Sequence, residues 1–190
     1  MNEDKINESV KEKKPFSLKD ELFDWAEITS QVLVVIVLLF IFIIRNTGVD
    51  GSSMVPTLHD KDVVLISNMF YTPEPGDIVV LTKYGFEPEP GVVSPIVKRV
   101  IATEGQVVDI NFETSEIRVD GKLLYEPYIS EPTRNRGDVA FPVTVPEGCI
   151  FVMGDNRNNS TDSRFSVVGM IDQRMILGKV ILKIPSWRKK

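Results

Sequence analysis

One apolar run constrains the fold of this chain more than any other feature. Residues 32–44 are all apolar, VLVVIVLLFIFII, and the segment can be extended back to residue 28 to give 17 residues. As an α-helix these 17 residues are roughly 26 Å long, which is short but sufficient for a hydrocarbon layer roughly 30 Å thick. The run therefore predicts one transmembrane anchor helix, which we assign to residues 25–45.

A cleaved leader peptide and a buried core helix are two other interpretations of this run. A leader peptide ends in small residues with an A-x-A-like pattern, whereas Arg45, Asn46 and Thr47 follow here. We therefore favour an uncleaved anchor. Residues 1–24 are polar and lack apolar periodicity, so they are expected to form a disordered tail.

The distribution of lysine and arginine predicts the orientation of the anchor. Only Arg45 and Lys61 follow the run within about twenty residues, the range over which such charges matter. Five lysines precede it: Lys5, Lys11, Lys13, Lys14 and Lys19. This bias favours a single-pass protein of the cell membrane with a cytoplasmic N-terminus and an extracytoplasmic domain at 46–190.

The composition of the remaining chain excludes some classes of protein. About 145 residues suffice for one well-buried domain, or for a core with a small insertion. The net charge of −5 argues against a nucleic-acid partner. A single cysteine, Cys149, excludes an intramolecular disulfide, which fits either a reducing cytosol or an exported domain with a large core.

Beyond the anchor, the pattern predicts a mainly β domain. Residues 108–112 alternate apolar and polar side chains, which is the period of a half-buried strand, and Asp120-Gly121 is a two-residue hairpin signal. Strands are expected at 63–67, 77–82, 96–103, 107–112, 117–119, 150–153 and 179–184. Proline-bearing loops are expected at 72–76, 87–95 and 127–146, and a loop or subdomain insertion at roughly 104–148.

Two potential sites are poorly supported. Cys149 stands beside apolar residues in an expected strand, so a buried structural thiol is preferred over a nucleophile. His59 is the only histidine of the chain, and it shares no ligand spacing with Cys149, so a metal site is not expected.

The turn Gly51-Ser52-Ser53 raises the question of a serine nucleophile, which needs a base. His59 is six residues from Ser53, in a polar turn, and we interpret it as a solvated turn residue. A desolvated lysine can replace histidine. Lys98 lies in the apolar stretch 96–101, and its neutral form would be favoured if it faces the apolar side. On the pattern alone, an outward-facing strand lysine is the preferred interpretation.

A polar segment at 154–164, GDNRNNSTDSR, completes the set of candidate segments. It follows an expected strand, and it suits either a loop with Asx turns or a group of side chains that position a base.

These segments together resemble the motifs of the bacterial type I signal peptidases, membrane-anchored Ser-Lys proteases that cut leader peptides from exported proteins. Residues 53–58, SMVPTL, resemble the nucleophile motif, and 98–101, KRVI, resemble the lysine motif. Residues 76–79, GDIV, resemble a structural motif, and 154–164 resemble the last motif. The similarity covers roughly residues 25–184, and the single anchor without a disulfide is similar to the Gram-positive form.

The resemblance implies a signal-peptidase-like, all-β catalytic core with an inserted β subdomain, preceded by one transmembrane helix. Ser53 would be the nucleophile and Lys98 the general base, and Ser160 would hydrogen-bond the lysine amine. The implied supporting residues are the pairs Asp162–Arg164 and Arg99–Asp155, and the implied walls of the substrate pockets are Val49, Leu58 and Val97.

The implied activity is removal of N-terminal signal peptides from preproteins after small residues at positions −3 and −1. The implied partners are preproteins and the lipid bilayer, and no metal or organic cofactor is implied. Some members carry a hydroxyl residue two positions before the nucleophile, where this chain has Gly51. The N–H of Ser53 would then be the main oxyanion donor, and Ser52 at most an auxiliary one. Many members also carry a Pro-Tyr pair before the nucleophile, which residues 43–48 lack.

Two other functions share parts of this pattern. A self-cleaving repressor-type protease uses the same Ser-Lys chemistry, but it would need a DNA-binding domain where the anchor stands. A non-catalytic anchored β domain would serve as a binding or assembly module, but Ser53, Lys98 and Asp162 are all present.

Overall fold

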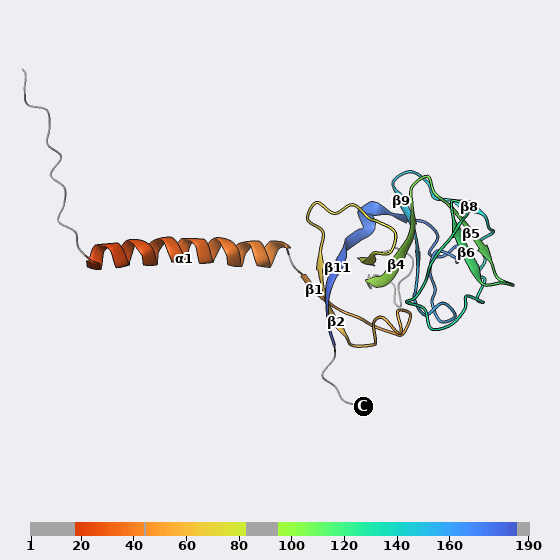
Figure 1. Ribbon diagram of the computed structural model, residues 1–190, viewed down its shortest axis with the longest axis horizontal. Helices are drawn as coiled ribbons and strands as arrows, with labels where there is room; N and C mark the ends of the chain where they lie inside the picture. The colour runs from red at the N-terminus through yellow and green to blue at the C-terminus, as the bar shows by residue number, and fades with distance from the viewer. Residues whose placement is uncertain (1–17, 44, 83–94, 186–190) are drawn as a thin grey trace, which may run out of the picture. The chain divides into compact units, whose positions relative to one another are not determined.

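The computed structural model describes residues 18–43, 45–82 and 95–185 (Figure 1). The chain forms two compact units, with the division between Ile41 and Phe42. The first unit is built on helix α1 (Leu18–Ile43), and the second contains two antiparallel sheets.

Helix α1 begins earlier than the sequence pattern predicts. Residues 18–24 are helical, so the prediction of a disordered tail is wrong for them, whereas residues 1–17 lie outside the described residues. Leucine, lysine and glutamate are good helix formers, and extending an existing helix adds a hydrogen bond per residue without a new nucleation step. At the other end Arg45, which we assigned to the anchor, begins strand β1.

The apolar side chains of α1 between Val32 and Leu38 are exposed. Within the part of the chain that the structure describes, no helix has the combined length and apolar character needed to cross a membrane. The anchor at 25–45 therefore stays a prediction from the sequence.

The larger sheet of the second unit has the strand order β1-β2-β11-β3-β4-β9-β10. Neighbouring strands are antiparallel, and β11, the last described strand, pairs with β2 on one side and β3 on the other. Figure 1 shows β11 beside β2. The elements are β1 (Arg45–Gly48), β2 (Val63–Ser67), β3 (Ile78–Leu81), β4 (Ile96–Thr103), β9 (Cys149–Met153), β10 (Ile171–Asp172), the 3-10 helix η1 (Gln173–Met175) and β11 (Ile176–Ile184).

The smaller sheet has the order β7-β6-β5-β8, and all its strands come from residues 107–144. They are β5 (Val107–Asn111), β6 (Glu116–Val119), β7 (Lys122–Leu123) and β8 (Val143–Thr144). Asp120 and Gly121 both have positive φ and join β6 to β7, as the hairpin signal predicts. In Figure 1, β5, β6 and β8 lie together on the side of this unit away from β1 and β2.

The prediction of a mainly β domain is confirmed, and the strands expected at 63–67 and 96–103 have those bounds in β2 and β4. Strands β7, β8 and β10 were not predicted, because two residues are too few to show a period. Strand β1 was not predicted, because its sequence RNTG contains no apolar residue. The loop expected at 87–95 falls almost entirely outside the described residues.

Three clusters of buried apolar side chains form the core of the second unit. One lies within the larger sheet and contains Val79 and Val152, and another joins the two sheets through Ile101 and Phe151. The third packs beneath the turn at Gly51-Ser52-Ser53 and consists of Val49, Met54, Leu58, Val64, Ile66, Val80 and Val97. The turn therefore rests on a rigid apolar base.

Candidate active site

Strand β4 carries Lys98 into the protein interior. The strand lies between β3 and β9, and residues 97–102 are all buried, so both of its faces are covered. Lys98 is 4% exposed. The interpretation of Lys98 as an outward-facing strand residue is therefore wrong.

Lys98 Nζ and Ser53 Oγ are 2.8 Å apart and hydrogen-bonded. Burial lowers the pKa of Lys98 from 10.5 to about 8, because an ammonium group loses its hydration there. The Asp162 and Asp155 carboxylates oppose this shift of the pKa, and the Arg164 guanidinium adds to it. Lys98 thus has a substantial neutral fraction in mildly alkaline solution and can accept the proton of Ser53.

The nucleophile candidate stands in a turn that its neighbours hold firmly. Gly51 has a φ of +88°, which favours glycine, and its N–H donates to Asp60 Oδ1 at 2.8 Å. Met54 and Leu58 are each 1% exposed and anchor the turn in the apolar cluster below it. Among the described residues no acceptor takes the N–H of Ser53, so this group is free to bind a substrate oxygen.

The loop that follows β9 packs directly on the serine turn. The N–H of Asn156 donates to the carbonyl oxygen of Ser53 at 2.9 Å, and its Nδ2 donates to the carbonyl oxygen of Ser52 at 3.0 Å. A Cβ on Gly154 would lie 2.5 Å from the carbonyl oxygen of Ser53 and closer still to Ser160 Oγ. Only glycine lets the two segments approach this closely.

The structure brings together both predicted ion pairs. Arg99 binds Asp155 through two bonds of 2.7 Å, from Nε to Oδ1 and from Nη2 to Oδ2. Arg164 binds Asp162 in the same bidentate geometry, with both hydrogen bonds at 2.8 Å. The hydroxyl of Thr57 also donates to Asp155. Asp155 therefore links the lysine strand to the serine turn.

The structure does not place Ser160 as predicted. Its side chain is 5% exposed, and within the described residues its Oγ has no hydrogen-bond partner. The hydroxyl lies against Gly154, while the amine of Lys98 is hydrogen-bonded to Ser53. The predicted hydrogen bond from Ser160 to Lys98 is therefore not formed in this structure.

An open cleft of about 280 Å³ lies beside the Ser53–Lys98 pair. It is lined by Asp50, Gly51, Ser52, Ser53, Pro95, Ile96, Val97, Lys98, Asn159 and Thr161. Of the three predicted pocket walls, Val97 lines this cleft, while Val49 and Leu58 are buried with it in the cluster below.

His59 and Cys149, for which no catalytic role was expected, do not line this cleft. The side chain of His59 is 59% exposed, and its Nδ1 lies 3.9 Å from Asp62 Oδ2. Cys149 is the first residue of β9 and packs against the cluster that contains Phe151, but it is half-buried and not fully buried as expected. In the described part of the chain, Lys98 is the basic group that is hydrogen-bonded to Ser53.

Some residues around the site had no role in the sequence interpretation. Asn156 and Asn159 fall in the polar segment at 154–164, so their composition was noticed but not their contacts with the serine turn. The ring of Tyr128 lies 3.9 Å from the guanidinium carbon of Arg99. No local pattern points to Tyr128, because it comes from a proline-bearing loop distant in sequence.

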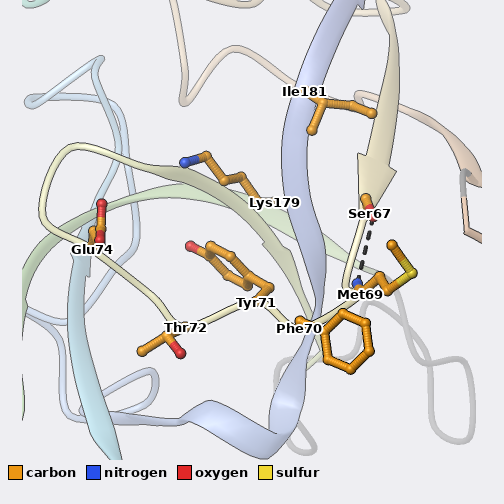
Figure 2. Close-up of a pocket in the computed structure, with 8 residues that line it drawn as sticks. All are labelled: Ser67, Met69, Phe70, Tyr71, Thr72, Glu74, Lys179 and Ile181. Atoms are coloured by element: carbon orange, nitrogen blue, oxygen red, sulfur yellow. Dashed lines mark hydrogen bonds between the residues drawn. The ribbon is translucent and has the colours of Figure 1, made fainter.

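A second hollow of about 410 Å³ lies between the segment after β2 and strand β11 (Figure 2). The Tyr71 hydroxyl donates to Asp77 Oδ2 at 2.8 Å, and Lys179 Nζ lies 2.6 Å from Asp77 Oδ1. Figure 2 shows Tyr71 and Lys179 on one side of this hollow and Phe70 on another. Tyr71 and Lys179 therefore both bind the carboxylate of Asp77, and we assign them a structural role.

Comparisons with known proteins identify the family of the chain. The family model "Signal peptidase, peptidase S26" matches residues 22–187. Signal peptidase I of Bacillus licheniformis is 35% identical over 175 residues, covering 88% of this chain and 90% of the relative. Signal peptidase I S of Bacillus subtilis (strain 168) is 34% identical over 171 residues, covering 85% and 88%. A solved signal peptidase I from Enterococcus faecalis V583 is 27% identical, with a TM-score of 0.44, and covers 58% of this chain and 97% of that one. The matched segment and the curated relatives show that this chain belongs to the signal peptidase family, peptidase S26, and is a protease.

Proposed function

We propose that the protein is a membrane-anchored serine endopeptidase that removes N-terminal signal peptides from exported preproteins by a Ser-Lys mechanism. The observation that carries this proposal is the 2.8 Å hydrogen bond between Ser53 Oγ and the buried amine of Lys98, beside an open cleft. The curated relatives, named signal peptidase I, support the substrate class.

In the first half of the reaction, neutral Lys98 takes the proton of Ser53 as Oγ attacks the carbonyl carbon of the scissile bond. The carbonyl electrons move to the oxygen, and the free N–H of Ser53 stabilises the resulting oxyanion. Protonated Lys98 then gives its proton to the leaving amine as the C–N bond breaks. The products are an ester on Ser53 and the new N-terminus of the mature protein.

In the second half, the same lysine serves a water molecule. Neutral Lys98 takes a proton from water, and the water oxygen attacks the ester carbonyl. The bond to Ser53 Oγ breaks, and the proton returns from Lys98 to that oxygen. The leader peptide leaves with a new C-terminal carboxyl group, and the site is restored.

The buried ion pairs position the groups that react. The Asp162 carboxylate accepts a hydrogen bond of 3.0 Å from the N–H of Gly154 as well as those from Arg164. This fixes the loop on which the serine turn rests. We assign Asp162, Arg164, Asp155 and Arg99 as supporting residues, because their contacts are with protein groups and not with the cleft.

Specificity is proposed to come from small pockets for the substrate side chains at positions −3 and −1. Val49, Leu58 and Val97 lie together in the cluster beneath the serine turn, which leaves little depth for a large side chain. Small residues would therefore fit and large ones would be excluded.

The membrane anchor is part of the same proposal. It is supported by the apolar run at 32–44, by the lysine bias before it, and by the exposure of the side chains from Val32 to Leu38. An anchor would hold the site near the bilayer, where substrates tethered by their own apolar segments are concentrated.

The test is to incubate the purified full-length protein with an exported precursor and to identify the products by mass spectrometry. We expect a single cut after small residues, and no cut by the Ser53→Ala variant. A panel of precursors with Ala, Leu or Phe at positions −3 and −1 then tests the pockets. Equal turnover of all three would mean that the substrate class is wrong, and a lack of any cleavage would favour a non-catalytic module.

A further inference from the structure

The hydroxyl of Ser52 has a partner that the proposed mechanism does not use. Asn159 Nδ2 donates a hydrogen bond of 2.9 Å to Ser52 Oγ. The two residues are 107 positions apart in the sequence, and both line the cleft that contains Ser53 and Lys98. This contact joins the polar loop to the serine turn at the edge of the substrate site.

In the hydrogen bond with Asn159, Ser52 Oγ is the acceptor, so the hydroxyl proton of Ser52 can still be donated. A serine hydroxyl has one proton to donate and two lone pairs that accept. The amide group of Asn159 uses one lone pair, and no acceptor among the described residues takes the proton. Because Ser52 lines the cleft, that proton is available to an oxygen atom of the substrate.

The backbone of Ser52 is held as firmly as its side chain. Its carbonyl oxygen accepts hydrogen bonds from the N–H of Val55 at 3.1 Å and from Asn156 Nδ2 at 3.0 Å. The next carbonyl, that of Ser53, accepts from the N–H of Asn156 at 2.9 Å. These bonds hold the backbone that carries the Ser52 hydroxyl in place before substrate binds, and Asn159 restrains its oxygen atom. A donor that stabilises a transition state must be positioned in advance in this way.

Gly51 leaves the position two residues before the nucleophile without a side-chain donor. The N–H of Ser53 is otherwise the main donor near the nucleophile. We infer that the Ser52 hydroxyl is the second oxyanion donor, and that Asn159 is the positioning residue that holds Ser52 Oγ as an acceptor and so directs its proton to the substrate. This inference rests on the proposed function and assigns two further residues to it.

The test compares variants of the full-length protein in steady-state cleavage of a precursor. Ser52→Ala should lower kcat about tenfold and change KM little, because the lost bond forms only in the transition state. Ser52→Thr keeps a hydroxyl and should keep most of kcat. Asn159→Asp replaces the amide by a carboxylate that only accepts, so it should draw the Ser52 proton away and lower kcat by a similar factor.

Two controls separate this role from a structural or electrostatic one. The double variant Ser52→Ala, Asn159→Asp should lose no more than either single variant, because both remove the same donor. Asn159→Leu removes the amide without adding a charge and should also lower kcat, so a loss confined to Asn159→Asp would point to the new charge and not to the contact with Ser52. The new carboxylate of Asn159→Asp could also lower kcat by raising the pKa of Lys98. The decrease in kcat should therefore persist at alkaline pH, where Lys98 is neutral in both proteins.

The outcomes that overturn the inference are distinct from those that overturn the proposed function. If the wild type cleaves precursor but Ser52→Ala keeps its kcat, the donor role is wrong and the function stands. The positioning role of Asn159 is wrong if the fold-decrease in kcat of the double variant equals the product of the two single fold-decreases. It is also wrong if Asn159→Asp regains the kcat of the wild type at high pH. If the wild type cleaves no precursor, the proposed function falls, and this inference falls with it.

Discussion

At the scale of single residues, the chemistry of the site depends on a lysine that burial has made a weaker base. Lys98→Arg keeps the positive charge but should abolish cleavage, because arginine stays protonated at accessible pH and cannot take the proton of Ser53. Initial rates of precursor cleavage, with folding checked by circular dichroism, measure this effect. Substantial activity in a well-folded Lys98→Arg protein would refute the role of Lys98 as base.

His59→Ala is the matched control for the identity of the base. The histidine is exposed and lies beside Asp62, so its removal should leave most of the activity. A loss of ~1000-fold, within the range for removing a general base, would restore the Ser-His interpretation that the structure disfavours.

The pH dependence of cleavage should report the same lysine. Because burial lowers the pKa of Lys98 to about 8, kcat/KM should rise with pH, with a midpoint at about 8, and then level off. A profile measured from pH 6 to pH 10 with one precursor decides this point. A midpoint near 10.5 would mean that Lys98 is solvated in the working enzyme.

Burial of Lys98 should also cost stability, with a definite dependence on pH. The pKa is lower in the folded than in the unfolded chain, so the unfolded chain binds more protons between about pH 8 and 10.5, and stability rises with pH in that window. Below it the cost is fully present, at up to about 3 kcal/mol. Lys98→Met should therefore raise the free energy of unfolding at pH 7, by less at pH 10. Urea denaturation at the two pH values measures this, and a less stable variant at pH 7 would contradict it.

The sequence allowed some residue-level features to be predicted and not others. Lys98 could be named as a candidate because it lies in an apolar stretch, but the pattern alone favoured an outward-facing lysine, and the family resemblance decided its role. The partners of Arg99 and Arg164 came only from a family resemblance, since Arg99 and Asp155 are 56 positions apart and no local period relates them. The Ser160 bond was wrongly expected because side-chain direction in a tight loop depends on neighbours such as Gly154.

At the scale of elements, the fit of the 154–164 loop on the serine turn decides whether the site forms. Gly154→Ala should strongly reduce both activity and stability, because the added Cβ would meet the carbonyl oxygen of Ser53 and the side chain of Ser160. Thermal melting and precursor cleavage measure the two effects. Gly48→Ala is a suitable control, since a Cβ there meets nothing within 4 Å; equal behaviour of the two variants would show that the close packing is unimportant.

Strands were predictable where their length and burial produced a clear period. Strand β4 could be located because burial on both faces produces a continuous, mostly apolar run of eight residues. Strand β5 could be located because burial on one face produces alternating apolar and polar residues. Strand β10 contains only two residues, which owe their conformation to β9 beside them. Helix α1 began earlier than expected because propagation carried it into polar residues.

At the scale of the whole molecule, the sequence predicts an orientation across the membrane that can be tested directly. Residues 1–24 should lie in the cytoplasm and 50–190 outside, because lysines are concentrated before the apolar run. Protease treatment of intact cells stripped of their wall should digest the domain or its loops. Full protection, with access only after lysis, would reverse the orientation.

Strand β11 connects the two halves of the larger sheet by hydrogen bonds, which has a consequence for the synthesis of the protein. This last described strand joins β2, next to the nucleophile turn, to β3, which pairs with the lysine strand. While the ribosome has not yet added the residues of β11, which ends at Ile184, the chain lacks the hydrogen bonds that connect the two halves of the sheet. We therefore expect the active site to be incomplete in a nascent chain until β11 has been translated.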